Sequence, residues 1–241
     1  MYFCRMNFLR NNLANAFTLG NLFSGSIGVI SLLNGDYTLA AICIVISLVL
    51  DFLDGFVARA MKADSNLGVQ LDSLADMVTF GLLPGLTMYK MLENTQGGLI
   101  SDLFPFLKFF GLFITLFSCL RLAIFNLDDE QKYYFKGLNT PTNTIFIYGL
   151  YYAYQEFGAY DYVVLNGAFL LVITALSSWL LISPIRMISL KFKSLQIRDN
   201  YSKIALFIGI IALLAIFGIT GIPLAVMYYL VVSLVFQKQL K

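Results

Sequence analysis

Residues 51–59 read DFLDGFVAR and residues 68–76 read GVQLDSLAD, and these two stretches decide how the chain folds. They place four acids, Asp51, Asp54, Asp72 and Asp76, at the adjoining ends of two apolar runs. Residues three or four apart share one face of a helix, so the acids of each stretch are expected to point the same way. Only residues 60–67 connect the runs, so the two helices must be antiparallel neighbours. The sequence predicts a helical hairpin whose aspartate pairs face each other.

The composition of the chain indicates whether this hairpin lies in water or in a membrane. The 241 residues are 59% hydrophobic and 12% charged, with a mean hydropathy of +0.78. Soluble domains carry about 25% charged residues, so a water-soluble globular enzyme and a disordered chain are both excluded. The sequence predicts an all-α, polytopic integral membrane helix bundle, and we expect residues 1–241 to form a single domain.

The apolar runs give the number of membrane spans, since a spanning helix needs about 20 residues. They cover 17–33, 37–58, 69–92, 103–126, 143–158, 162–183, 204–218 and 220–236. Eight spans with both termini inside is the predicted topology, and six spans plus two re-entrant or interfacial segments is the alternative, because 143–158 and 204–218 are short. Residues 1–9 are too short to span and lack a cleavage site, so they predict an N-terminal interfacial helix.

The basic residues test this topology, because Lys and Arg collect on the cytoplasmic side. With both ends inside, 14 of the 16 Lys and Arg residues lie on one side, and only Lys90 and Lys108 lie on the other. The basic connection 186–203 is interpreted as a topology determinant or a contact for anionic headgroups. Because membrane orientation accounts for the basic residues, the sequence predicts a lipid bilayer as a partner and no nucleic acid.

The residue types available restrict the chemistry. The chain has no histidine, and its three cysteines, Cys4, Cys43 and Cys119, form no CxxC pair. Inserting one aspartate near the centre of a membrane helix costs about 2.5–3.5 kcal/mol, so four in one hairpin need compensation. Arg59 is the single strong cation close by in sequence, and oxygen-only ligands suit one or two Mg²⁺ or Mn²⁺ ions. A network of ion pairs and a cation-coupled membrane transporter are the alternatives.

Residues 51–76 follow the pattern D-x2-D-G-x2-A-R-x8-G-x3-D-x3-D, which resembles the signature of the CDP-alcohol phosphotransferases. The resemblance implies a membrane enzyme that transfers a phosphatidyl group from a CDP-lipid to an alcohol and releases CMP. It also implies that the four aspartates bind a dinuclear metal site, that Asp76 is the general base and that the protein forms a homodimer. By the same resemblance Gly55, Ala58 and Arg59 lie along the CDP. Gly68 either leaves backbone open to this ligand or only allows close helix packing.

Three further elements resemble the phosphatidylserine synthase branch of that family. Residues 15–21 (NAFTLGN), 121–126 (RLAIFN) and 135–141 (FKGLNTP) resemble its P-N-x-x-T-x-x-N, R-L-A-R-F-N and F-K-G-L-P-T-P elements, with substitutions at Ala14, Ile124 and Asn139. This resemblance implies CDP-diacylglycerol and L-serine as substrates.

The branch resemblance also adds candidate binding residues, which are Asn15 and Thr18 for the CDP, and Arg121 and Lys136 for serine or phosphate. Taken alone, Arg121 could equally be an interfacial arginine and Lys136 an ordinary cytoplasmic lysine. Glycerol phosphate or another acceptor alcohol remains the alternative within the family. We expect a bacterial inner membrane, with the active site facing the cytoplasm.

Overall fold

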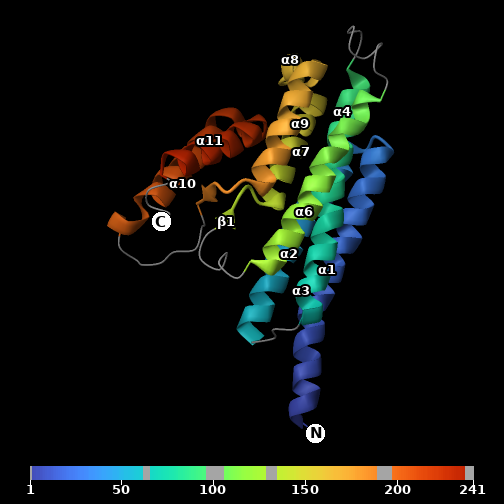
Figure 1. The fold of residues 1–241 in the computed structure, drawn as a ribbon, viewed down its shortest axis with the longest axis vertical. Coiled ribbons are helices and arrows are strands. Elements are labelled where there is room, and N and C mark those ends of the chain that lie inside the picture. The colour runs from blue at the N-terminus through green and yellow to red at the C-terminus, as the bar shows by residue number, and fades with distance from the viewer. Residues whose placement is uncertain (1, 62–65, 96–105, 129–134, 189–196, 237–241) are drawn as a thin grey trace.

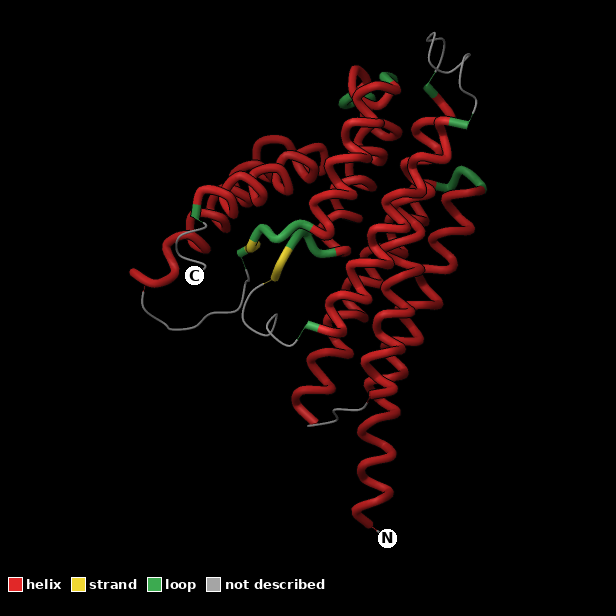
Figure 2. Tube along the Cα trace, in the orientation of Figure 1, coloured by secondary structure: helices red, strands yellow, loops and turns green. Residues whose placement is uncertain are grey.

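The structure is a computed structural model that describes residues 2–61, 66–95, 106–128, 135–188 and 197–236. These residues are helical almost throughout (Figure 2), which confirms the all-α membrane bundle. The elements are α1 Tyr2–Leu33, α2 Tyr37–Met61, α3 Asn66–Asp76, the π-helical turn η1 Met77–Leu82, α4 Leu83–Asn94, η2 Leu107–Leu112, α6 Phe113–Leu127, β1 Phe135–Lys136, α7 Thr140–Phe157, α8 Asp161–Val164, α9 Gly167–Ile182, β2 Arg186–Met187, α10 Ile197–Phe217, η4 Gly218–Gly221 and α11 Ile222–Val235.

Several helical segments are long and apolar enough to cross a membrane. In the described part of the chain these are Leu13–Leu33, Tyr37–Ala60, Leu107–Leu127 and Tyr201–Val235, with Gly167–Ile182 as a shorter apolar helix. The last long stretch is two helices, α10 and α11, because η4 separates them where Gly218 takes a left-handed φ of 57°. The polytopic bundle is therefore confirmed, while the count of eight spans stays a prediction.

The N-terminal segment, expected as an interfacial helix, is helical and continuous with the first long helix, and its place at the membrane interface stays a prediction. Residues 2–9 are helical, but they form the first turns of α1, which continues unbroken to Leu33. No Gly or Pro occurs between residues 2 and 19, so nothing in the sequence ends the helix there. In Figure 1 these first turns extend past the other helices at the end marked N.

The third apolar run was expected as one regular helix, but a π-helical turn interrupts it directly after Asp76. Pro84 follows in the first turn of α4 and has no N–H to give to the carbonyl four residues earlier, that of Phe80. Thr144 of α7 donates to that free carbonyl instead, at 3.1 Å. Such π-turns are frequent at functional sites.

The core lies where α1, α2, α4 and α7 meet. Its fully buried side chains include Leu32, Leu83, Met88 and Ile147. Gly25 lets α1 approach η1 closely, because a Cβ there would overlap the Thr79 hydroxyl. These apolar side chains are buried against one another and pack closely. This packing holds the hairpin against α7.

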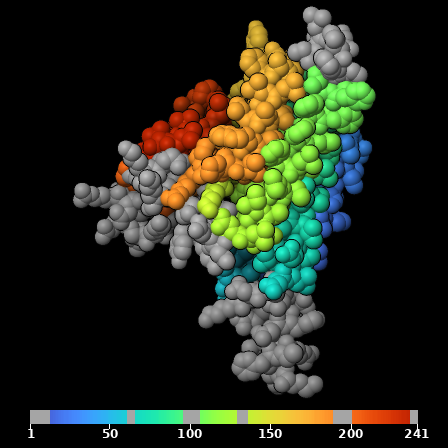
Figure 3. All heavy atoms as spheres, viewed as in Figure 1, coloured from blue at the N-terminus to red at the C-terminus, as the bar shows by residue number. Residues whose placement is uncertain are grey.

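Two features lie beside this bundle. A short antiparallel pair, β1 with β2, joins Phe135 to Met187 and Lys136 to Arg186, which the all-α expectation did not include. Helices α10 and α11 pack on each other and lean obliquely away from the bundle (Figures 1 and 3). Lys191 and Lys193 of the predicted basic connection lie outside the described residues.

Candidate active site

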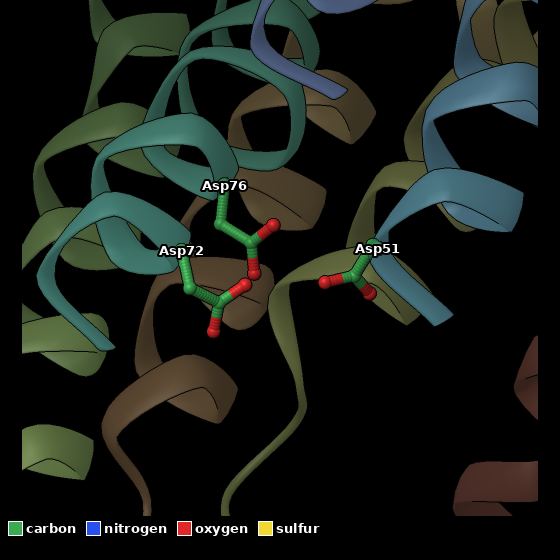
Figure 4. A group of neighbouring side chains, drawn as sticks. All are labelled: Asp51, Asp72 and Asp76. Atoms are coloured by element: carbon green, nitrogen blue, oxygen red, sulfur yellow. The ribbon is translucent and has the colours of Figure 1, made fainter. Parts of the chain in front are cut away.

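Three of the predicted aspartates converge. Asp51 of α2 and Asp72 and Asp76 of α3 offer carboxylate oxygens that all lie within 4.8 Å of one another. Asp72 and Asp76 lie one turn apart on α3 and point toward Asp51 across the interface (Figure 4). Asp76 is buried, with 8% of its surface exposed. The hairpin predicted from the aspartate spacing therefore forms.

The donor set fits a hard cation. Three neighbouring carboxylates repel each other when ionised, and among the described residues no cationic side chain forms an ion pair with any of them. Asp72 Oδ1 is buried without a hydrogen-bond partner in that part of the chain. Oxygen ligands of this kind suit Mg²⁺ or Mn²⁺, so the described residues form a group that could hold a divalent metal.

Asp54, the fourth predicted ligand, lies outside this group of three. Its Oδ2 accepts a 2.7 Å hydrogen bond from Thr18 Oγ1 of α1, and its side chain is buried. The carboxylate still lies close enough to Asp72 to repel it. Asp54 as a metal ligand remains a prediction, whereas the contact places Thr18, a predicted CDP-binding residue, directly beside the carboxylates.

Asn21, at the end of the 15–21 element, lies beside the carboxylates although no role was predicted for it. Its Nδ2 donates to Asp76 Oδ1 at 3.2 Å, and its Oδ1 accepts from Thr79 Oγ1 at 3.0 Å. Asn21 is fully buried. Its place one turn after Thr18 on α1 was the signal that could have selected it.

The small residues of the signature lie around Arg59 and the hairpin loop. A Cβ at Gly55 would be 3.2 Å from Arg59 Nη1, so the guanidinium folds back over this glycine. Ala58 is half-buried beside it on α2, and Gly68 is half-buried at the start of α3. Asn15 is half-buried on α1, one turn before Thr18.

The two later sequence elements contact each other and the hairpin. Arg121 of α6 is buried, and its Nε donates to the Leu138 carbonyl at 2.7 Å. Asn126 Nδ2 donates to Ser73 Oγ of α3 at 2.8 Å, a link that was not predicted from the sequence. Asn139, found where the branch pattern has proline, caps α7 by accepting from the Thr142 N–H at 2.8 Å.

The two predicted cations for serine or phosphate differ in their surroundings. Lys136 pairs with Asp128 at 2.9 Å in a partly exposed position. Arg121 makes no ion pair with the described residues, and it lies near enough to Asp76 to interact with it electrostatically. Arg121 is therefore the buried cation nearest to the carboxylates in the described part of the chain.

An apolar cavity of about 1130 Å³ opens between α2, α7 and the α10–α11 pair. Its walls are mainly aliphatic, including Val45, Ile145 and Ile210. Arg59 and Asn139 are polar residues on its lining. The cavity therefore places aliphatic walls and the predicted CDP-binding residue Arg59 around one space.

The chain belongs to the CDP-alcohol phosphatidyltransferase family, which its residues 11–179 match. This range contains the hairpin, Arg121 and α7. It ends before α10 and α11, so the helices that form one wall of the cavity lie outside the match.

Curated relatives share a single name, CDP-diacylglycerol–serine O-phosphatidyltransferase. The chain is 32% identical to the Helicobacter pylori protein over 138 residues, 55% of this chain and 54% of that one. It is 34% identical to the Bacillus subtilis protein over 125 residues, 52% of this chain and 66% of that one. It is 29% identical to a Mycobacterium tuberculosis protein over 228 residues, 91% of this chain and 72% of that one. The match thus spans little more than half of the Helicobacter relative.

Proposed function

We propose that this protein transfers the phosphatidyl group of CDP-diacylglycerol to the hydroxyl of L-serine, giving phosphatidylserine and CMP. The observation that carries the proposal is the convergence of Asp51, Asp72 and Asp76 at the signature positions of the family. The name shared by the curated relatives supports serine as the acceptor.

The carboxylates have two tasks in this proposal. Asp51, Asp54, Asp72 and Asp76 hold one or two divalent ions, Mg²⁺ or Mn²⁺, whose chemistry when bound is to neutralise the diphosphate and the departing CMP. Asp76 also takes the proton from the serine hydroxyl as the serine oxygen bonds to the lipid-side phosphorus and the bond from that phosphorus to the CMP oxygen breaks. Since Asn21 holds Oδ1 of Asp76, Oδ2 is the atom that receives the proton.

The remaining predicted residues bind the two ends of the lipid nucleotide. Asn15, Thr18, Gly55, Ala58, Arg59 and Gly68 line the CDP in this proposal, and Arg59 offers a planar fork that suits phosphate oxygens. The apolar cavity beside Arg59 is the place for an acyl chain, since its walls are mainly aliphatic. Arg121 and Lys136 are the candidate cations for the acceptor.

We also propose a homodimer in a bacterial inner membrane, with the carboxylates at its cytoplasmic side. The distribution of basic residues supports this orientation. Lys90 and Lys108, the two basic residues predicted on the opposite side, lie at one end of the bundle, where Lys90 Nζ donates to the Leu33 carbonyl at 2.9 Å and Lys108 pairs with Glu93 at 2.7 Å.

The test is an assay of the purified full chain in vesicles with CDP-diacylglycerol and Mn²⁺ or Mg²⁺. Serine, glycerol 3-phosphate and inositol are supplied in parallel, and CMP and the lipid product are followed. Serine-dependent CMP release, lost in Asp76→Asn, is the expected result. Release with another alcohol only would overturn serine as the acceptor, and ion uptake without CMP release would favour the transporter alternative.

A further inference from the structure

Three buried polar side chains without partners in the described part of the chain lie on α6, α7 and α9, and α9 packs against both of the other helices. Ser118 and Asn143 are fully buried, and Ser178 is 4% exposed. The oxygen of each serine, and both the oxygen and the nitrogen of the Asn143 amide, have no hydrogen-bond partner among the described residues. Leaving such groups unpaired in a protein interior is costly and rare, so three of them on helices that pack together call for a partner that the described residues do not supply.

A chain of hydrogen bonds places these three side chains at one level. Arg121 Nε of α6 donates to the Leu138 carbonyl at 2.7 Å, and the Leu138 N–H donates to the Leu180 carbonyl of α9 at 2.9 Å. Ser118 lies one turn before Arg121 on the same face of α6, and Ser178 lies two residues before Leu180. In the direction of the chain, α6 and α9 run toward this pair of hydrogen bonds, whereas α7 runs away from it. Asn143, in the first turn of α7, therefore lies level with both serines.

This level of the bundle lies next to η1, the turn that follows Asp76. Thr144, the neighbour of Asn143, donates to the Phe80 carbonyl of η1 at 3.1 Å. On the side of α6, a Cβ at Gly81 of η1 would be 3.2 Å from Ser118 Cβ. Because η1 begins directly after Asp76, the unpartnered groups lie about one helical turn beyond the base and beside Arg121.

We propose that Asn143, with Ser118 and Ser178, binds the amino-acid end of the acceptor and determines specificity for it, an inference that rests on the proposed function. Serine carries a carboxylate and an ammonium on one carbon. The Asn143 amide offers a donor to the first and an acceptor to the second, and the serine hydroxyls do the same. Arg121, a buried guanidinium with no ion-pair partner in the described residues, balances the carboxylate charge. The acceptor hydroxyl is then left facing Asp76.

This arrangement favours an amino acid over an alcohol phosphate. Glycerol 3-phosphate offers the amide oxygen of Asn143 only a neutral hydroxyl where serine offers an ammonium, and a hydrogen bond from a charged donor is about twice as strong. Asn143 is thus a residue that separates the serine-using reaction from the glycerophosphate alternative.

The experiment compares Asn143→Leu with the wild-type full chain in vesicles, with CDP-diacylglycerol and serine varied separately. Leucine keeps the volume and removes both polar atoms. The expected result is a rise in the KM for serine of about 10–100-fold, as for lost hydrogen bonds to charged groups. The KM for CDP-diacylglycerol and the kcat should stay within about twofold, since Asn143 takes no part in the transfer step. The melting temperature should not fall, because an unpaired buried amide has been removed.

Two further variants complete the comparison. Ser178→Ala removes one oxygen with little change in volume and should raise the KM for serine by a smaller factor. Thr87→Val is the matched control, because Thr87 is equally buried but its hydroxyl is bonded to the Leu83 carbonyl at 2.8 Å on α4. An unchanged KM for serine in Asn143→Leu and Ser178→Ala overturns the inference, as does an equal rise for both substrates. Failure of the proposed function is seen separately, as a wild-type protein that does not use serine.

Discussion

The Asn21 side chain holds Asp76 by a 3.2 Å hydrogen bond from Nδ2 to Oδ1, and Thr79 in turn holds Asn21 by donating to its Oδ1 at 3.0 Å. The Thr79 hydroxyl thus sets which end of the amide faces the carboxylate. Ser47 Oγ donates to the Asn21 backbone carbonyl at 3.2 Å, which fixes this turn of α1 against α2. One buried amide therefore connects the aspartate hairpin to both α1 and η1.

Replacing Asn21 by leucine should lower turnover by about 10–100-fold, the usual cost of removing a group that orients a metal-binding carboxylate. The Asp76 carboxylate loses its fixed rotamer, while the substrates keep their contacts, so the KM for CDP-diacylglycerol should change little. Steady-state CMP release measures both quantities. Ser24→Ala is the control, since Ser24 lies one turn along α1 and donates to the Cys43 carbonyl at 2.9 Å, away from the aspartates. Full turnover in a folded Asn21→Leu protein would contradict the orienting role.

Asp51→Asn should stabilise the protein without metal but reduce the stabilisation that Mn²⁺ gives. Without metal, the variant should melt about 2–4 °C higher for each kcal/mol of carboxylate repulsion that is removed. With Mn²⁺ at a hundred times its Kd, the wild type should gain about 2.7 kcal/mol of stability, and the variant should lose most of this gain. Thermal unfolding with and without Mn²⁺ gives both values.

Asp161→Asn is the control for that measurement, because Asp161 is an exposed acid in the four-residue helix α8. Its melting temperature should respond to Mn²⁺ as the wild type does. If Asp51→Asn kept the full response to Mn²⁺, Asp51 would not be a ligand.

The spacing of the aspartates was enough to predict that Asp51, Asp72 and Asp76 converge, because helical periodicity and a short loop leave two antiparallel helices few other arrangements. The same periodicity placed Asp54 beside Asp51, whereas Thr18 of α1 holds its carboxylate apart from the group of three. A contact from a third helix is a tertiary event that spacing within one hairpin does not contain.

The fold shows the same limit. Apolar runs predicted where helices lie, but not the π-turn after Asp76, which depends on Pro84 and on the Thr144 hydroxyl that compensates the Phe80 carbonyl. Nor did they predict the partner of Arg121, because the Leu138 carbonyl lies 17 residues further along the chain, outside the helix that carries Arg121. Local patterns are visible in the sequence, and long-range hydrogen bonds are not.

Gly55→Ala should raise the KM for CDP-diacylglycerol by about tenfold, the cost of weakening one charged hydrogen bond. The added methyl group would lie 3.2 Å from Arg59 Nη1 and displace the guanidinium from its place over α2. Gly20→Ala is a matched control, because its methyl group would lie 3.3 Å from Leu50 Cδ1, on a side chain that the proposed site does not use. Equal KM values for the two variants would remove Arg59 from the diphosphate site.

Val45→Trp should discriminate between lipid substrates by chain length. Val45 lines the apolar cavity, yet its own side chain is 59% exposed, so an indole can be added there without disturbing the core. An acyl chain excluded from the cavity passes into the bilayer and loses its packing against the cavity wall, so the KM for long-chain CDP-diacylglycerol should rise. A short-chain CDP-diacylglycerol should be used as well as before, because its tails end before the obstruction.

Val49→Trp is the control that shows whether the effect of Val45→Trp on the KM values comes from the cavity. Val49 lies one turn further along α2, is 53% exposed and is not among the residues that line the cavity. The same bulk is thus added to the same helix, at a residue outside the cavity lining. Only Val45→Trp should change the ratio of the KM values for long and short chains, because only there does the ring enter the space between α2 and α11. A ratio changed equally in both variants would mean that the tails lie in the surrounding bilayer, and α10 and α11 would then have no part in binding the substrate.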